Sequence, residues 1–495
     1  MKNSIIKNIF SSLFCQVIAI IYGLIVPILI IKTFGSNING LVTSITQFLN
    51  YIILLEAGIG PIIKNALFKP LVDKNKSSIE KILGASDNFF KKISIIFLGY
   101  LFLLCVFYPL IINSKFDFIF TVSLILIISI SLFFEYFLGM KYKLFLQSDQ
   151  KNYVVDYVNA LTYILNLIII VFLLKIGANI QLVKLSSTFS YVLRPIFMKI
   201  YFDKKYGYKI DKKSDYKFEK KWDGITHHIA SVVQSNTDVV VLTLFSSMLN
   251  VSIYSVYNLI INGVRSISVA FTNGMDAFFG KMMVNYKNND INKKFSIYSV
   301  FFYTVITILL SCCVVLIIPF VSLYTSNIHD ANYVQPLFAY VMVIAEFLYI
   351  IRYPYSTIVY SKGHFKETSF FSIIEPIVNI IVSIFLVRRF GLIGVALGTL
   401  ISMPIRSIGF IVYATKNILK SNLYNSFKII VISFVELLII CFVNYNFVFF
   451  QIDNFFSWVI YALILILIIS LIIITINILF FRDTFKMLFK GGKKC

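Results

Sequence analysis

Fourteen apolar stretches, each long enough to cross a lipid bilayer as a helix, dominate this chain of 495 residues. A membrane-spanning helix needs about 20 consecutive apolar residues, and a helix satisfies all of its own backbone hydrogen bonds in lipid. The stretches lie at residues 8–32, 39–66, 93–112, 118–140, 153–174, 181–200, 224–247, 252–280, 295–320, 331–359, 368–388, 392–413, 427–446 and 456–480. With 59% hydrophobic and 14% charged residues, the sequence predicts an all-α integral membrane protein with fourteen transmembrane helices.

The net charge of +22 is distributed unevenly between the loops. If the N-terminus is cytoplasmic, most of the 45 lysines and arginines fall in the inner loops and tails. The basic residues on the outer side are Lys32, Lys115, Lys175, Arg388 and Arg389. This asymmetry places both termini in the cytoplasm. The basic charge therefore sets topology and contacts anionic membrane lipid, and we expect no nucleic-acid partner.

An internal repeat divides the chain. Matches at a near-constant offset pair Gly60 with Gly274, Asn166 with Asn379, Gly177 with Gly391, and Arg194 with Arg406. They predict two pseudo-symmetric six-helix lobes in the same orientation, as in transporters built from parallel repeats. The predicted parts are an N-terminal lobe at 1–200, a basic cytoplasmic linker at 201–223, a C-terminal lobe at 224–416, and a helix pair with a basic tail at 417–495.

Arg194, Arg265 and Arg406 lie deep inside predicted helices. Each is roughly 20 Å from the outer end of its helix at 1.5 Å per residue, close to mid-bilayer. A charge at this depth costs at least a few kcal/mol, so such residues usually face a wet cavity. Three guanidinium groups at one depth predict a protein that holds an anion.

A polar face on the eighth span points to where this cavity lies. Its members recur at helical spacing: Asn258, Asn262, Arg265, Val269, Thr272 and Asp276. Further polar candidates are Gln234 on the seventh span, Gln47 on the second and Gln16 on the first. We expect spans 1, 2, 7 and 8 to line a cavity between the lobes.

The charged residues within the predicted spans also have possible structural roles. Arg265 either contacts substrate or pairs with Asp238, and Arg194 and Arg406 lie beside prolines, where they could bond the carbonyls exposed at a kink. Arg352 and Glu375 lie near the inner ends of their spans, where we expect Arg352 to reach the interface and Glu375 to be cheaply solvated.

Three deeper acids, Asp238, Glu56 and Glu346, are candidates for binding or gating by a coupling ion. A buried salt bridge is an equally good explanation for each of them.

The sequence predicts a protein that is not an enzyme. We find no catalytic motif and no nucleotide-binding loop, and hence expect no cofactor. The six cysteines and four histidines show no metal-ligand spacing, so we expect no metal site. No predicted outer loop exceeds roughly a dozen residues, which leaves no room for an extracytoplasmic catalytic domain.

Several segments resemble Wzx-type polysaccharide repeat-unit flippases of the multidrug/oligosaccharidyl-lipid/polysaccharide exporter superfamily. They are FGSNINGLVTSITQFLNYIILLEAGIG at 34–60, GITHHIASVVQSNTDVVVLTLF at 224–245 and RRFGLIGVALGTLISM at 388–403. The resemblance implies a two-lobed secondary transporter of the bacterial cell membrane that works by alternating access. Its substrate would be an undecaprenyl-diphosphate-linked oligosaccharide, with a proton or sodium as coupling ion and a polysaccharide polymerase as partner.

Other functions remain open from the sequence. A lipid II or sporulation-related flippase shares nearly every feature. A multidrug exporter of the same superfamily predicts an acidic, aromatic cavity and commonly twelve spans. A membrane enzyme such as a polysaccharide polymerase predicts a substantial outer loop with catalytic residues.

Overall fold

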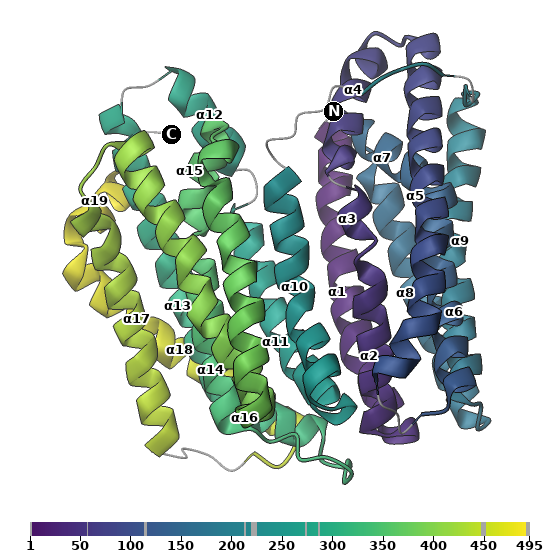
Figure 1. The fold of residues 1–495 in the computed structure, drawn as a ribbon. Helices are drawn as coiled ribbons and strands as arrows, with labels where there is room; N and C mark the ends of the chain where they lie inside the picture. The colour runs from purple at the N-terminus through teal and green to yellow at the C-terminus, as the bar shows by residue number, and fades with distance from the viewer. Residues whose placement is uncertain are drawn as a thin grey trace. The chain divides into compact units, whose positions relative to one another are not determined.

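The structure, a computed structural model, describes residues 2–56, 58–112, 116–211, 214–218, 225–272, 275–285, 288–446 and 452–491. Every regular element in these ranges is helical (Figure 1). Gly274 of the sequence repeat, and residues 212–213 and 219–223 of the predicted linker, lie outside these ranges. The chain forms two compact units, Met1–Val232 and Val233–Cys495, and the boundary between them falls within one helix.

Six long helical segments build the first unit. Its elements are α1 (Lys2–Phe34), α2 (Ser36–Asn50), α3 (Ile53–Glu56), α4 (Ile59–Val72), α5 (Lys76–Ile111), α6 (Phe118–Phe134), the π-helix η1 (Glu135–Gly139), α7 (Met140–Ser148), α8 (Asn152–Lys175) and α9 (Ile180–Tyr206). Helix α8 packs against both α1 and α9, and α6 packs against α9. These four helices surround the arginine described below.

The second unit contains the remaining helices. They are α10 (Ile225–Phe245), α11 (Met248–Thr272), α12 (Met275–Asn285), α13 (Asn288–Tyr324), α14 (Pro336–Ile350), α15 (Tyr353–Lys362), α16 (Phe365–Tyr413), η3 (Ala414–Leu419), α17 (Leu423–Asn446), α18 (Phe455–Phe480) and α19 (Arg482–Gly491). Helix α14 packs against α16, and α13 packs against both α17 and α18.

All fourteen predicted spans coincide with long helical segments. Ten stretches are long and apolar enough to cross a membrane, and one of them, Phe365–Leu419, contains both 368–388 and 392–413. The other three predicted spans lie in α9, α10 and α11, which are 27, 21 and 25 residues long. The all-α membrane fold predicted from the sequence is therefore confirmed.

Three predicted spans are not continuous helices. The span 39–66 divides into α2, α3 and α4, where Gly58 adopts a left-handed conformation with φ of 71° before α4. The span 252–280 divides between α11 and α12, and 331–359 begins as a helix at Pro336 and divides between α14 and α15. Apolar length predicted these segments but not their breaks, because a short turn within an apolar run leaves its mean hydropathy almost unchanged.

The repeat predicted from the sequence has a counterpart in backbone conformation and side-chain bonding. Gly177 and Gly391 both have positive φ, 73° and 53°. Asn166 and Asn379 are both fully buried, and each donates its amide N–H to a hydroxyl: Asn166 to Tyr22 at 2.9 Å, Asn379 to Thr399 at 2.9 Å. These two pairs therefore have matched structural roles, whereas Arg194 and Arg406 have different partners.

A π-helical turn, η1, interrupts the segment from α6 to α7. At its end, a Cβ atom added to Gly139 would lie 3.1 Å from the Cβ atom of Pro195. The missing side chain lets α9 approach closely at the position next to Arg194. A π-turn of this kind commonly occurs at functional sites.

Large apolar side chains remain exposed on the outer faces of both units. Examples are Phe102 and Phe107 on α5, and Leu463, Leu467 and Leu471 on α18. Exposed apolar surface on this scale is expected where lipid, not water, covers the helices.

Candidate functional site

Arg265 on α11 forms a two-point ion pair with Glu346 on α14. Its Nε donates to Oε1 at 2.9 Å, and a terminal guanidinium nitrogen donates to the other carboxylate oxygen. The guanidinium also lies 4.4 Å from the ring centroid of Tyr349. The sequence offered Asp238 as the structural partner of Arg265, and this was wrong, because the residue that pairs with Arg265 is Glu346. The Arg265 side chain nevertheless keeps 25% of its surface exposed.

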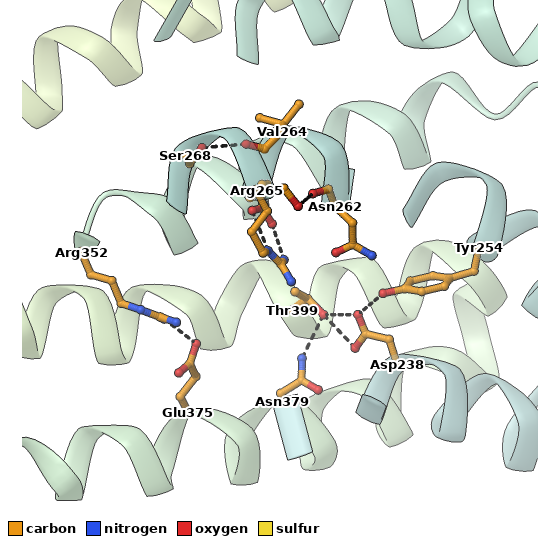
Figure 2. A network of polar contacts seen from close by, with 12 residues as sticks. Asp238, Tyr254, Asn262, Val264, Arg265, Ser268, Arg352, Glu375, Asn379 and Thr399 are labelled. Atoms are coloured by element: carbon orange, nitrogen blue, oxygen red, sulfur yellow. Dashed lines mark hydrogen bonds and ion pairs between the residues drawn. The ribbon is translucent and has the colours of Figure 1, made fainter. Parts of the chain in front are cut away.

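A second cluster lies next to this pair and is fully buried. Arg352 lies 3.8 Å from the Tyr349 ring centroid and donates to Glu375 at 3.0 Å. Arg406 donates to the other oxygen of Glu375 at 3.3 Å. One carboxylate thus serves two guanidinium groups, as Figure 2 shows for Arg352.

This cluster corrects two expectations from the sequence. Arg352 does not extend to an interface, because it is 4% exposed and paired within the protein. Glu375 is 0% exposed, so it is not a cheaply solvated surface acid. Arg406, one of the three mid-depth arginines, is held by an ion pair, and its Nε is buried without a hydrogen-bond partner.

Asp238 on α10 is held by neutral groups instead. Tyr254 donates its hydroxyl to Oδ2 at 2.9 Å, and the Thr399 hydroxyl lies 3.0 Å from each carboxylate oxygen (Figure 2). Asn379 donates in turn to the Thr399 oxygen at 2.9 Å, and its own amide oxygen is buried without a partner. No ion pair reaches Asp238 from the part of the chain that the structure describes. The cluster is thus a buried carboxyl group in contact with two hydroxyl groups.

Arg194 on α9 has a different environment from the other two mid-depth arginines. Its Nε donates to Thr162 at 2.8 Å, and its guanidinium lies 4.7 Å from the ring centroid of Tyr163 and 4.3 Å from that of Tyr191. One terminal nitrogen is buried without a hydrogen-bond partner. Among the described residues, no carboxylate forms an ion pair with it. Arg194 is therefore a cation held by rings and a hydroxyl.

A cavity of about 320 Å³ within the first unit contains Arg194. Residues of α1, α2, α6, η1, α7, α8 and α9 line it. Its polar and ionisable lining residues are Tyr22, Thr46, Asn50, Ser131, Glu135, Lys143, Asn159, Lys184, Ser187, Thr188, Tyr191 and Arg194. Lys143 pairs with Glu135 at 3.1 Å, which leaves Lys184 and Arg194 without a paired carboxylate in the described part of the chain. The lining therefore carries an excess of positive charge.

The other predicted cavity residues have varied environments. Gln16 on α1 is exposed and Gln47 on α2 is half-buried, and neither lines the cavity around Arg194. Gln234 on α10 is buried, and its amide oxygen has no partner. On α11, Asn258 is half-buried and Asn262 is exposed, on the same face as Arg265.

The two remaining coupling candidates are both partnered. Glu56, at the end of α3, accepts from the Tyr136 hydroxyl at 3.4 Å. Glu346 is the partner of Arg265. A structural salt bridge is therefore the better account of Glu346.

The sequence analysis did not identify the aromatic residues that lie beside these arginines. Tyr163 and Tyr191 flank Arg194, and Tyr349 lies between Arg265 and Arg352. Glu346 and Tyr349 are three residues apart on α14, a spacing that puts them on one face, and Arg352 follows three residues later in the turn before α15. That spacing was the available signal, but tyrosine is common throughout this chain.

No family model and no curated protein matches this sequence. Solved structures do match its fold. A lipid II flippase, MurJ, in an inward closed conformation has a TM-score of 0.64 at 19% sequence identity, covering 98% of this chain and 99% of its own. An inward-facing multidrug resistance MATE family transporter of the MOP superfamily has a TM-score of 0.64 at 14% identity, covering 81% and 94%. A MOP superfamily transporter from Pyrococcus furiosus has a TM-score of 0.53 at 14% identity, covering 85% and 97%. The chain has the fold of these membrane transporters.

Proposed function

We propose that this protein is a flippase that moves undecaprenyl-diphosphate-linked polysaccharide repeat units from the cytoplasmic to the outer leaflet by alternating access. The observation that carries the proposal is Arg194, a cation without a paired acid in a cavity with excess positive charge. A planar guanidinium binds phosphate oxygens through two parallel hydrogen bonds. The nitrogen of Arg194 that lacks a partner supplies one such donor.

The rest of the proposed route uses the polar face of α11. Arg265 remains a candidate for substrate contact because a quarter of its side chain is exposed despite the ion pair with Glu346. Asn258 and Asn262 lie on the same face. The remaining polar residues that we propose for this route are Gln234, Gln47, Gln16 and Arg406. The domains that we propose for this transporter are the six-helix lobes at 1–200 and 224–416, the linker at 201–223 and the helix pair with its tail at 417–495.

We further propose that a proton or sodium ion couples to transport at Asp238. Its carboxyl group is buried without a cationic partner in the described chain, and the hydroxyl oxygens of Tyr254 and Thr399 contact it. Oxygen atoms are the ligands that a hard monovalent cation prefers, and an ionised residue inside a membrane protein is a functional candidate by default.

Two observations favour a flippase over a drug exporter as the function of this protein. The match to MurJ covers 98% of this chain, whereas the matches to MATE transporters cover 81–85%. A transporter of cationic drugs should also carry excess negative charge in its cavity, which is opposite to the lining around Arg194. A flippase for lipid II or another lipid-linked glycan is the second candidate.

The cellular setting that we propose follows from the charge distribution in the sequence. We propose that both termini lie in the cytoplasm of a bacterium, because basic loops favour the cytoplasmic side of a membrane. A diphosphate-linked glycan delivered to the outer leaflet would be consumed by a polysaccharide polymerase.

The test replaces Arg194 in a strain that lacks the chromosomal gene. Arg194→Ala should abolish surface polysaccharide and leave the lipid-linked glycan accessible on the inner leaflet, while Arg194→Lys should retain part of the export. Arg388→Ala, at an exposed arginine over the Phe245 ring, is the matched control and should export normally. Normal polysaccharide in the Arg194→Ala strain at equal protein level would contradict the proposal. Loss of cationic drug resistance in the deletion strain, with normal polysaccharide, would assign the exporter function instead.

A further inference from the structure

Glu436 on α17 is a buried acid for which the transport mechanism proposed above has no role. Its side chain is 5% exposed, and both of its carboxylate oxygens are buried without a hydrogen-bond partner. It differs in this respect from Glu346, Glu375 and Asp238, each of which accepts a hydrogen bond from another side chain of the same unit. An ionised carboxylate in this position would lose its hydration with no compensating contact, at a cost of several kcal/mol.

Helices α13 and α17 run in the same direction side by side, and two contacts set their register. Near the start of α13, Asn292 donates at 2.9 Å to the carbonyl of Leu419, which ends η3 four residues before α17 begins. Near the end of α17, Asn444 donates at 3.5 Å to the carbonyl of Val314 within α13. Two turns back from Asn444 is Glu436, and two turns back from Val314 is the turn that carries Thr307. Glu436 and Thr307 therefore lie at the same level of this helix pair.

Three hydroxyl groups along the two helices are, like Glu436, buried without a hydrogen-bond partner. Thr307 and Ser311 lie one turn apart on α13, and Ser433 lies one turn before Glu436 on α17. All three are 0% exposed, and the oxygen of each has no hydrogen-bond partner. We call these residues, with Glu436, the hydroxyl seam. It offers oxygen acceptors to an acid proton but no cation to an ionised carboxylate.

The ionisable groups on the elements around α17 form no ion pair or hydrogen bond with Glu436. They are Asp290, Lys293, Lys294, Tyr298, Tyr303, Cys312, Cys313 and Tyr324 on α13, Tyr340, Glu346 and Tyr349 on α14, Lys416 on η3, Tyr461 on α18, and Tyr424, Lys428, Cys441 and Tyr445 on α17 itself. Several are bonded elsewhere. Tyr303 donates to the carbonyl of Ile351, Tyr340 accepts from Asn444, and Glu346 pairs with Arg265.

We propose that Glu436 is a reversible proton-binding site, and that its carboxyl group is neutral while α17 lies against α13. A neutral carboxyl can donate its O–H to an oxygen of the hydroxyl seam and accept a hydrogen bond from another. Loss of the proton leaves a buried charge between the helices and weakens their packing. Because the packed state binds the proton and the separated state releases it, packing of α17 is favoured at low pH and weakened as pH rises. This inference is independent of the substrate.

Infrared spectroscopy of the purified full-length protein tests the protonation state directly. The difference spectrum of the wild type minus Glu436→Gln at neutral pH should contain the carbonyl stretch of a protonated carboxylic acid. Glutamine has the size of glutamate and no charge, so this variant should fold. Glu367→Gln, at an exposed acid at the start of α16, is the matched control and should remove a carboxylate band. A carboxylate band for Glu436 at neutral pH would overturn the proposal.

Thermal unfolding as a function of pH tests the consequence for packing. The unfolding temperature of the wild type should fall relative to that of Glu436→Gln as pH rises, whereas Glu367→Gln should follow the wild type. Parallel curves for the wild type and Glu436→Gln would overturn the proton-linked packing. Sodium that stabilises the wild type but not Glu436→Gln would replace the proton site with a metal-cation site.

Discussion

Arg265 and Glu346 are held together by two hydrogen bonds between a guanidinium fork and a carboxylate. The arginine is a quarter exposed, while the acid is almost fully buried. Glu346 is therefore inaccessible within the protein, whereas part of the Arg265 guanidinium remains accessible. Glu346 can fix the orientation of Arg265 while leaving that part free to contact another group.

Removing the buried member of this pair should destabilise the protein. Glu346→Gln leaves a guanidinium without its counterion, and we expect a loss of about 2–3 kcal/mol, below the 3–5 kcal/mol of a fully buried pair. Thermal unfolding in detergent measures the change. Glu135→Gln, which breaks the half-exposed pair with Lys143, is the control and should cost no more than about 1 kcal/mol. Equal effects of the two substitutions would contradict this assignment.

Glu375→Gln should be more destabilising than Glu346→Gln. Glu375 is the shared counterion of Arg352 and Arg406, so its loss leaves two buried cations in one cluster. We expect lower yield and a lower unfolding temperature, and partial recovery when Arg352→Met is added, because that change removes one of the two uncompensated charges. Absence of any recovery in the double variant would mean that the two arginines are not coupled through Glu375.

Gly177→Ala tests the left-handed turn between α8 and α9. No atom lies within 4 Å of an added Cβ atom, so the cost arises from the backbone alone, where φ is +73°. We expect about 1–2 kcal/mol of destabilisation. Gly99→Ala in the helical interior of α5 also meets open space, and should instead stabilise by about 0.5–1 kcal/mol. Thermal unfolding measures both effects: the unfolding temperature should fall for Gly177→Ala and rise for Gly99→Ala, each relative to the wild type.

Asp238→Asn should remove the dependence of transport on a cation gradient. The amide keeps the size of the carboxylate and the contact with Tyr254, but it carries no charge to attract an ion. Transport in proteoliposomes is measured under imposed sodium, proton and voltage gradients. Asp156→Asn is the control, because Asp156 also accepts from hydroxyl groups, those of Ser11 and Ser12. Full gradient dependence in Asp238→Asn would exclude Asp238 as the coupling site.

The helices of this fold could be predicted from the sequence, because apolar length is nearly sufficient to define a segment in lipid. The partners of the charged residues could not. Depth along a helix can be counted from its end, and it placed Asp238 within reach of Arg265. The direction in which a side chain points depends on the rotation of each helix about its axis, which packing decides. Glu346 faces Arg265, while Asp238 faces Tyr254 and Thr399.

The sequence allowed the three mid-depth arginines to be interpreted only from residues of their own helices. Arg265 lay on the polar face of the eighth span, and the proline beside Arg194 allowed a structural role. The environment of Arg194 depends on Tyr163, which lies on a different helix, and on a cavity lined by seven elements. Such an environment leaves no periodic pattern in any one segment.

The π-helical turn η1 changes the direction in which residues after it point around the helix axis, relative to residues before it. In a regular α-helix, residues eight apart point about 80° away from each other. The extra residue that a π-turn accommodates compensates for most of this rotation, so Glu135 and Lys143 meet at 3.1 Å across it. Deleting one residue within 136–139 would convert the π-turn into a regular α-helical turn and leave Glu135 and Lys143 seven residues apart, still on nearly the same face. The π-turn therefore makes this stretch the place between α6 and α7 where the loss of one residue should be tolerated best, with the contacts of Lys143 to Glu135 and of Lys141 to Asp87 retained.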